Sequence, residues 1–302
     1  MKTFIEVKDQ DLSRPQERPA KTNWKIEMIK KALGVLQYAS PKKSAEIIWH
    51  YFTMPGKVRF SDKQLDIMAE AATGQMSYKG DIIKTYRWGT EGPKVLLCHG
   101  WRSKTADFRK MIMSLRANGY VVEGFDLRAH GNSEGKHTAL PEYRDILKNY
   151  ITKNGPYEVV VGYSIGALAT GVTLSELGPQ FQPNHYFVIA APPYIRYFFK
   201  DIVEEVGCND AVYTSMCHLV KAHYSQPIDY FDLRIKMQDL KHMDTHLIYC
   251  EDDQIIPFRK GLELEECWPQ ASFVHAKGLG HYKIISDEAI ISYITNKISR
   301  KH

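Results

Sequence analysis

Apolar and polar residues alternate along most of the chain in a pattern that predicts strands and helices in turn. Helical periodicity is present at Ala106–Asn118, Tyr143–Lys153, Ile165–Leu177 and Asp287–Ile298. Between these helices, short runs of apolar and β-branched residues predict strands at Ile82–Trp88, Val95–Cys98, Tyr120–Phe125, Glu158–Gly162, Tyr186–Ala191, His246–Cys250 and Ser272–His275. This alternation predicts an α/β fold with a mainly parallel central sheet and helices on both faces.

The amino-terminal part of the chain does not follow this alternation. Residues 9–20 are polar and contain Pro15 and Pro19, which is typical of a loose arm. Two helical patterns follow, at Trp24–Leu36 and from Ser40-Pro41 to about Phe52. Their apolar faces could meet a membrane surface or a partner chain, but packing on a core is the commoner reason for such a stripe.

A second interruption falls between Pro192 and Leu240, where aromatic-rich helical patterns replace the expected strand. We interpret it as a helical lid inserted between two late strands. The chain is therefore expected to comprise an amino-terminal arm and helical extension (1–56), an α/β core (57–191 and 243–302) and a lid (192–242).

Composition and charge limit the class of protein. The 302 residues are 44% hydrophobic and 25% charged, as in ordinary globular enzymes. The net charge of +5 is spread along the chain without a long basic run, which disfavours a nucleic-acid partner. Five cysteines without paired spacing favour a reducing compartment. The start of the chain lacks a signal-peptide pattern, and no stretch approaches the ~20 apolar residues of a membrane span, so we expect a cytoplasmic protein without an integral membrane segment.

Ser164 is the candidate nucleophile. The strand ending near Gly162 leads directly into Gly162-Tyr163-Ser164-Ile165-Gly166 and then into a helix, the arrangement of a nucleophile elbow. The motif alone also arises by chance, and Ser164 could simply cap the helix. The strand before it and the helix after it favour the nucleophile, because a weakly reactive hydroxyl must protrude from a tight turn.

His281 is the candidate base among twelve histidines. It follows the last predicted strand in a glycine-rich loop, which brings it to the carboxyl edge of the sheet. His99 and His130 also follow strands, but both precede the serine, whereas in elbow enzymes the order is serine, acid, histidine. We expect His99 to brace a loop near the site and His130 to hold its own turn in shape.

The acid that orients the base must lie in the loop after His246–Cys250, where Glu251, Asp252 and Asp253 occur in a row. The residues alone do not choose among them, and one could instead cap the helix that starts near Pro257. Acyl transfer also needs N–H donors for the developing oxyanion. The backbone N–H groups of Ile165 and Trp101 are the candidates, and the Trp101 side chain is expected to wall the pocket.

Several separated motifs together resemble the α/β-hydrolase superfamily, over roughly Ile82 to Ile298. The similarity to its lipase and esterase branch rests on segments that occur in the family's order: His99-Gly100-Trp101, the turn from Asp126 to Ser133, the elbow at Gly162–Gly166, Asp253–Pro257, and Gly280-His281. The resemblance implies an α/β-hydrolase fold. It also favours Asp253 as the acid, because Asp253 and Pro257 match the family's D-x-x-x-P loop, with Asp252 as the second choice.

Departures from the family pattern reduce the number of branches of the superfamily that the chain resembles. Ala129 stands where a glycine is usual, a change expected to leave the turn intact. The glycine-rich oxyanion loop of one esterase group is missing. A serine nucleophile argues against the dehalogenases and epoxide hydrolases of this fold, which use aspartate.

The sequence thus predicts a serine hydrolase that cleaves a small-molecule carboxylic ester through an acyl-enzyme intermediate, without metal or cofactor. A thioesterase, an amidase or peptidase, and a carbon–carbon bond hydrolase use the same residues, and a non-catalytic binding module of the same fold is the alternative from another class. Natural substrate and oligomeric state stay open. Candidate pocket residues are aromatic, with plain packing as their alternative role: Tyr163, Tyr194, Tyr197, Phe198 and Tyr282.

Overall fold

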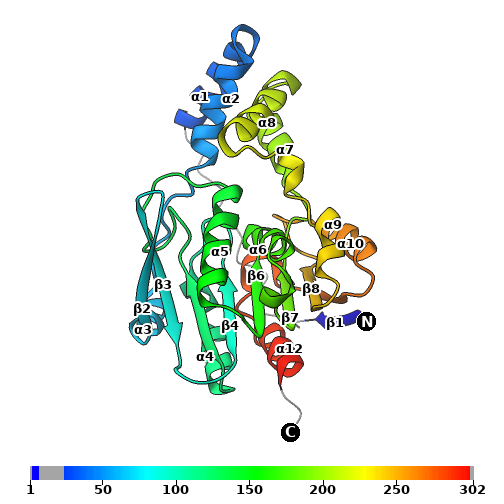
Figure 1. Ribbon diagram of the computed structural model, residues 1–302. Coiled ribbons are helices and arrows are strands. Elements are labelled where there is room, and N and C mark those ends of the chain that lie inside the picture. Colours follow the sequence, from blue (N-terminus) through cyan, green and yellow to red (C-terminus); the bar gives the residue numbers. More distant parts are fainter. Residues whose placement is uncertain (1, 7–23, 300–302) are drawn as a thin grey trace. The chain divides into compact units, whose positions relative to one another are not determined.

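The computed structural model describes residues 2–6 and 24–299 (Figure 1). The arm predicted at residues 9–20 lies outside this range. Contacts divide the described residues into two compact units. The first comprises residues 2–6, 55–193 and 233–299, and the second comprises residues 24–54 and 194–232.

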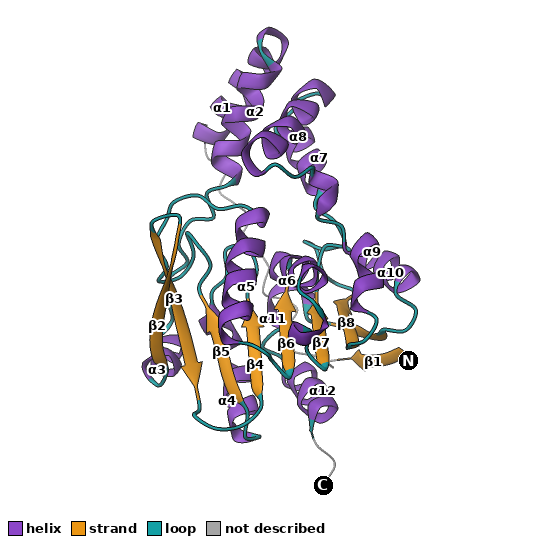
Figure 2. Ribbon diagram, viewed as in Figure 1, coloured by secondary structure: helices purple, strands orange, loops and turns teal. Residues whose placement is uncertain are grey.

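One nine-stranded sheet forms the centre of the first unit (Figure 2). Its order is β1-β9-β8-β7-β6-β4-β5-β3-β2. Only β3 runs against its neighbours β2 and β5, and all other adjacent strands are parallel. The predicted α/β fold with a mainly parallel sheet is confirmed. The strands are β1 (Lys2–Glu6), β2 (Ala72–Tyr78), β3 (Asp81–Trp88), β4 (Lys94–Cys98), β5 (Val121–Phe125), β6 (Val159–Tyr163), β7 (His185–Ile189), β8 (Asp244–Cys250) and β9 (Ser272–Lys277).

Helices of the first unit cover this sheet (Figure 2). They are α3 (Asp62–Ala69), α4 (Arg109–Ala117), α5 (Leu140–Asn154), α6 (Ile165–Glu176), α9 (Leu233–Lys236), α10 (Phe258–Cys267), α11 (Gly280–Lys283) and α12 (Glu288–Ile298). Short 3₁₀ turns occur at Thr105–Phe108, Pro179–Phe181 and Met237–Leu240.

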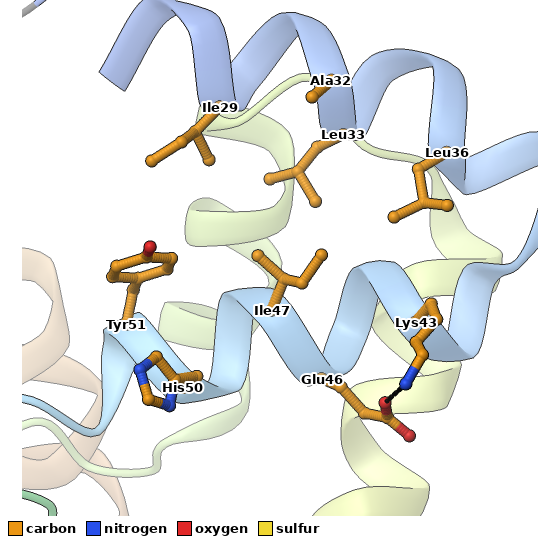
Figure 3. Close-up of a pocket in the computed structure, with 9 residues that line it drawn as sticks. All are labelled: Ile29, Ala32, Leu33, Leu36, Lys43, Glu46, Ile47, His50 and Tyr51. Carbon is orange, nitrogen blue, oxygen red and sulfur yellow. Dashed lines mark hydrogen bonds and ion pairs between the residues drawn. The ribbon is translucent and has the colours of Figure 1, made fainter. Parts of the chain in front are cut away.

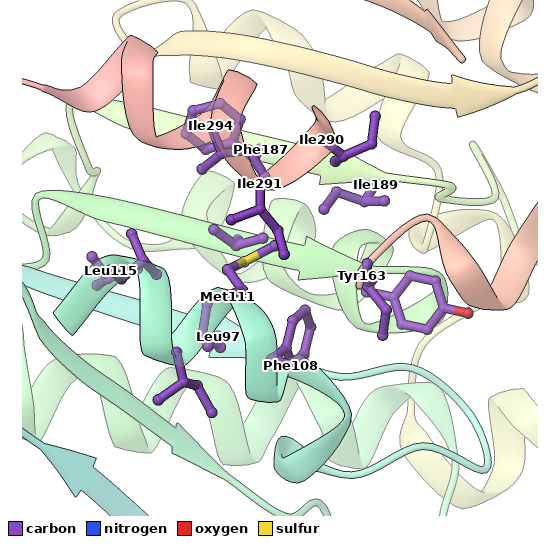
Figure 4. Packing of buried hydrophobic residues seen from close by; sticks show 14 of the residues in the cluster. Leu97, Phe108, Met111, Leu115, Tyr163, Phe187, Ile189, Ile290, Ile291 and Ile294 are labelled. Atoms are coloured by element: carbon purple, nitrogen blue, oxygen red, sulfur yellow. The ribbon is translucent and has the colours of Figure 1, made fainter. Parts of the chain in front are cut away.

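Alternate residues along the central strands face opposite sides of the sheet, as the two-residue repeat of a strand requires. On one side they pack with α4 and α12 in a buried cluster that includes Leu97, Phe108, Met111, Leu115, Tyr163, Phe187, Ile189, Ile290, Ile291 and Ile294 (Figure 4). On the other side the Tyr186 hydroxyl donates to the carbonyl oxygen of Ala167 in α6. Both faces of the central strands are therefore buried. This packing holds the carboxyl ends of the strands, where the candidate site lies, in fixed positions.

Two strands were not predicted from the sequence, β1 and β2. β1 pairs in parallel with β9, from Lys2 opposite Phe273 to Glu6 opposite Lys277. The prediction that residues 1–56 form only an arm and a helical extension is therefore wrong for residues 2–6, which belong to the core sheet. β1 is an edge strand with Phe4 57% exposed, so its apolar pattern does not mark a buried face.

The second unit is helical. It contains α1 (Trp24–Ala39), α2 (Pro41–Phe52), α7 (Arg196–Glu205), α8 (Asp210–Tyr224) and a 3₁₀ turn at Ile228–Tyr230. The two predicted amino-terminal helices are thus confirmed. α2 starts where the sequence indicates, because the Ser40 hydroxyl accepts from the Lys43 N–H at 3.3 Å and Pro41 occupies the first turn.

The amino-terminal helices and the 194–232 segment share one small core. The ring of Trp49 in α2 lies 6.0 Å from Phe199 in α7 and 6.3 Å from Tyr224 in α8. Gln37 in α1 donates to the carbonyl oxygen of Gly207 and accepts from the N–H of Asn209. The sequence prediction of two separate parts is therefore corrected: residues 24–54 of the extension and 194–232 of the segment interpreted as a lid form one compact unit, whereas residues 233–242, which were also assigned to the lid, belong to the first unit.

An open, mostly apolar pocket of about 490 Å³ lies between α1 and α2 (Figure 3). It is lined by Ile29, Ala32, Leu33, Leu36, Lys43, Glu46, Ile47, His50 and Tyr51. Among the described residues, no helix combines the length and the apolar character needed to cross a bilayer.

Candidate active site

Ser164 occupies a sharp turn between β6 and α6. Its backbone has φ 54° and ψ −132°, a left-handed conformation that is uncommon for a residue with a side chain. The turn is held on both sides: the Ser164 N–H donates to the Ile189 carbonyl oxygen at 2.8 Å, and its own carbonyl accepts from the N–H of Ala167 at 3.0 Å. A side chain at Gly166 would collide with the carbonyl oxygen of His99, so only glycine fits there. This is the geometry of a nucleophile elbow.

His281 connects Ser164 with Asp253. Its Nε2 atom lies 3.2 Å from Oγ of Ser164, and its Nδ1 atom lies 2.7 Å from Oδ2 of Asp253. Ser164 directly follows β6, Asp253 lies in the loop after β8, and His281 lies in the short helix α11 after β9, so their meeting depends on the parallel order of these strands. Ser164 is 8% exposed, and His281 and Asp253 are each 5% exposed. These three side chains are largely shielded from water, which strengthens the hydrogen bonds between them.

The three acids after β8 have different partners. Oδ1 of Asp253 accepts from the backbone N–H groups of Ile255 and Ile256, both at 2.8 Å, and this leaves Oδ2 for His281. Asp252 instead accepts from the N–H of Gly278 in the loop that carries the histidine. Glu251 lies 3.7 Å from the Lys277 ammonium. Of the candidate acids, Asp253 is thus the one against His281, whereas Asp252 supports the histidine loop.

Tyr163 lies behind the site and holds the histidine from its backbone. Its hydroxyl donates to the carbonyl oxygen of His281 at 3.0 Å, and the two ring centroids are 5.1 Å apart. Burial, followed by the nearby Asp253 carboxylate, raises the pKa of Tyr163 well above its ordinary value of 10.0. The hydroxyl therefore stays protonated as a donor. Sequence reasoning placed Tyr163 in the substrate pocket and missed this contact, for which no local motif gives a signal.

The loop after β4 approaches Ser164 closely. A Cβ atom at Gly100 would lie 2.7 Å from Cβ of Ser164 and 3.1 Å from the carbonyl oxygen of Tyr163. The next residue, Trp101, stacks on Tyr143 with ring centroids 6.4 Å apart. Ile165 is the first residue of α6, a position whose N–H has no acceptor within the helix. The roles of the Trp101 and Ile165 N–H groups toward an oxyanion stay predictions.

His99 and His130 brace the loops beside the site, because each ring accepts a hydrogen bond from the backbone of the other histidine's loop. Nε2 of His99 accepts from the Leu127 N–H at 3.0 Å, while Nε2 of His130 accepts from the Arg102 N–H at 3.1 Å. Each ring therefore holds the loop that contains the other. Burial lowers the pKa of His99 to about 4 and that of His130 to about 3. Both rings are accordingly neutral near pH 7, with Nε2 unprotonated.

The turn after β5 keeps its shape through Asp126. Its Oδ1 atom accepts from the Thr105 N–H at 2.9 Å, and its Oδ2 atom accepts from the Asn132 N–H at 2.8 Å. Ala129, where the family pattern has glycine, adopts a φ of 64°. Its N–H still donates to the Glu134 carbonyl oxygen at 2.8 Å. The substitution keeps the turn intact, and the left-handed backbone explains why glycine is usual there.

The remaining predicted pocket residues fall in different places. Tyr282 is 55% exposed next to His281, and the two rings are 5.5 Å apart. Tyr194, Tyr197 and Phe198 belong to the second unit, where Tyr197 stacks on Phe198 at 4.3 Å and contacts Tyr194 edge-on at 5.4 Å. Their contribution to a substrate pocket, and the lid role of residues 192–242, stay predictions.

The sheet order and the elbow define an α/β hydrolase, and comparison with protein families agrees. The model of the Alpha/beta hydrolase family matches residues 95–291, about two thirds of the chain, so the chain belongs to this family. A search of curated proteins found no match.

Similar solved structures share the fold at low sequence identity. An esterase of Pyrococcus furiosus superposes with a TM-score of 0.59 at 18% identity, covering 82% of this chain and 95% of that one. A thioesterase domain from the curacin biosynthetic pathway gives 0.53 at 15%, covering 76% and 99%. A bromoperoxidase from Bacillus anthracis gives 0.57 at 16%, covering 76% and 99%. Because these proteins differ in activity, the likeness establishes the fold and leaves the reaction to the site.

Proposed function

We propose that this protein is a serine hydrolase that cleaves a carboxylic ester through an acyl-enzyme intermediate. Ser164 is the nucleophile, His281 the general base and acid, and Asp253 the residue that orients His281. The observation that carries the proposal is the bridging imidazole, 3.2 Å from the serine hydroxyl and 2.7 Å from the carboxylate.

The hydrogen bonds of Asp253 support this direction of proton transfer. Its Oδ1 atom is occupied by two backbone N–H donors, so Oδ2 accepts the proton on Nδ1 of His281. Nε2 is then unprotonated and faces Oγ of Ser164 as a base. As Oγ attacks the ester carbonyl carbon, Nε2 takes the hydroxyl proton, and the positive ring that forms lies beside the Asp253 carboxylate.

Both chemical steps use the same three side chains. When the tetrahedral intermediate collapses, the C–O bond to the alcohol breaks and Nε2 returns the proton to the leaving oxygen. A water molecule then gives a proton to Nε2 and attacks the acyl carbon, and the carboxylic acid leaves as Oγ is reprotonated. The oxyanion of each intermediate is assigned to the N–H groups of Ile165 and Trp101. One such donor is worth ~3 kcal/mol in the transition state.

A fluorophosphonate probe tests the nucleophile, because it phosphonylates only an activated serine. We expect labelling of the wild type and of Ser215→Ala, a control outside the site, and no labelling of Ser164→Ala. Label retained by Ser164→Ala would remove Ser164 from the proposal.

Turnover of matched ester, thioester and amide panels tests the bond that is cleaved. We expect the ester to have the highest kcat/KM and its turnover to require Ser164. If labelling requires Ser164 but a thioester or amide is preferred, the ester assignment fails while the serine mechanism stands.

A further inference from the structure

Three potential metal ligands lie at the amino ends of β7 and β8, at the opposite end of the strands from the elbow. His185 is the first residue of β7, Asp244 is the first residue of β8, and His246 follows two residues later. Ser164, by contrast, follows the last residue of β6, which runs parallel to β7. A five-residue strand is about 16 Å long, so this group lies well away from the relay.

Strand geometry brings the three side chains to one face. His185 and Asp244 are direct neighbours in the register of β7 and β8, and His246 pairs with Phe187. Asp244 and His246 are two residues apart and thus point to the same side of the sheet. Each residue offers one ligand atom, a ring nitrogen or a carboxylate oxygen, and these three atoms all lie within 4.8 Å of one another.

The two imidazoles converge on one carboxylate oxygen. Nδ1 of His185 and Nε2 of His246 each lie 3.2 Å from Oδ2 of Asp244. Both nitrogens are buried, and neither makes a hydrogen bond of acceptable geometry with any group in residues 2–6 and 24–299. The Asp244 oxygen is near both buried nitrogens, but without good hydrogen-bond geometry it offsets their desolvation only in part, and a bound cation would complete the compensation.

The other nitrogen of His246 is already held. Nδ1 lies 2.9 Å from the hydroxyl of Tyr293 in α12, and the ring stacks on Phe187 with centroids 4.6 Å apart. The His246 side chain is only 1% exposed. Metal-binding histidines characteristically use the second ring nitrogen in such a contact, which fixes the ring and directs the first nitrogen at the ion.

We propose that His185, Asp244 and His246 form a binding site for a divalent transition-metal ion, with Zn²⁺ as the best match. Two imidazoles and a carboxylate suit this class of ion better than Ca²⁺ or Mg²⁺, which prefer oxygen ligands. Ligand atoms about 2.1 Å from a tetrahedral ion lie about 3.4 Å apart, close to the two separations of 3.2 Å here. The Asp244 side chain is 52% exposed, so solvent can complete the coordination.

The position of this site indicates a structural role. The ion would join the first residues of β7 and β8 and, through Tyr293, fix them to α12. Binding therefore stabilises the first unit and supplies no group to the Ser164 relay.

Calorimetric titration of the chelator-treated full chain with Zn²⁺ tests the site, with Co²⁺ absorption as a report on tetrahedral geometry. We expect one ion per chain and a rise in Tm on binding. His185→Gln and Asp244→Asn should each weaken binding by about 100-fold or more, and Tyr293→Phe by about 10-fold. His242→Gln, an exposed histidine, and Cys267→Ser, an exposed thiol, serve as controls and should bind as the wild type does.

The variants at His185 and Asp244 alter partly exposed side chains, and circular dichroism checks that they fold. Absence of binding by the wild type at millimolar Zn²⁺ would overturn the proposal. Binding that is unchanged in both variants would do the same, because the ion would then be held elsewhere.

Discussion

The hydroxyl of Tyr163 donates a hydrogen bond of 3.0 Å to the carbonyl oxygen of His281. Tyr163, the residue before Ser164, thereby fixes the backbone of His281, although Tyr163 and His281 are 118 positions apart in the chain. The serine and the histidine are thus positioned by a direct side-chain contact and also by a second contact through the core, which gives the relay a fixed geometry.

Removing that hydroxyl should loosen the base. We expect Tyr163→Phe to lower kcat for ester hydrolysis about fivefold, since one hydrogen bond contributes about 1 kcal/mol and KM depends little on a group behind the site. Steady-state kinetics measure the changes in kcat and KM separately. Tyr120→Phe, which loses a hydroxyl contact with the Ile298 carbonyl in the same unit, is the matched control and should keep kcat. An equal loss of kcat in both variants would mean that the effect is general destabilisation.

Asp253 and Asp252 should respond differently to the same substitution. In Asp253→Asn the amide oxygen stays with the N–H groups of Ile255 and Ile256, so the NH₂ group faces Nδ1 of His281. That nitrogen must then accept, which leaves the proton on Nε2 and removes the base. We expect kcat to fall by about 10⁴.

In Asp252→Asn the amide oxygen can still accept from the Gly278 N–H, so kcat should fall less than about tenfold. Single-turnover ester assays on both variants make the comparison. A larger loss in Asp252→Asn than in Asp253→Asn would contradict the assignment of the acid.

The close approach of Gly100 to Ser164 gives a third prediction. A methyl group at this position would lie 2.7 Å from Cβ of Ser164 and must displace either the loop or the elbow. Because the adjacent Trp101 N–H is an assigned oxyanion donor, we expect Gly100→Ala to lower kcat by about 10². In Gly34→Ala the added methyl meets nothing within 4 Å, so activity should not change. Wild-type kcat in Gly100→Ala would exclude this loop from the oxyanion site.

The sequence predicts the interior of the fold better than its edges. Each of the seven predicted strands is present with ends shifted by at most two residues. All of them except β3 run parallel to at least one neighbour, and buried parallel strands are near-continuous apolar runs. β2 was missed because its residues are mostly exposed and polar. A signal was available in Lys79-Gly80, whose φ angles of 50° and 88° make a two-residue hairpin turn into β3.

The candidate site likewise has features that the sequence predicts and features that it does not. Motif spacing and strand order predict that Ser164, His281 and Asp253 meet at the carboxyl ends of the strands, and the structure brings the three side chains within hydrogen-bond distance. The contacts of Tyr163 with His281, and of Asp252 with Gly278, were not found. In both, a side chain meets a backbone atom of a distant loop, and sequence pattern does not encode the direction of a carbonyl or an N–H group.

Acid sensitivity of the fold follows from the two buried histidines. The pKa of His99 is lowered to about 4 and that of His130 to about 3, both by burial, against 6.5 in the unfolded chain. Below pH 6.5 the unfolded chain therefore binds more protons than the folded one. The stability that these groups contribute is complete above about pH 6.5 and is lost as pH falls toward 4.

Protonation is unfavourable in the fold for a geometric reason as well. A proton on Nε2 would break the bonds from the N–H groups of Leu127 and Arg102, and two positive rings would stand 5.2 Å apart. Because both histidines have a pKa well below that in the unfolded chain, the free energy of unfolding should fall by several kcal/mol between about pH 7 and pH 4.5. Denaturant titrations across this range measure it. His130→Gln, which removes one titrating group, should have the shallower pH dependence, and an unchanged slope would show that other groups cause the acid sensitivity.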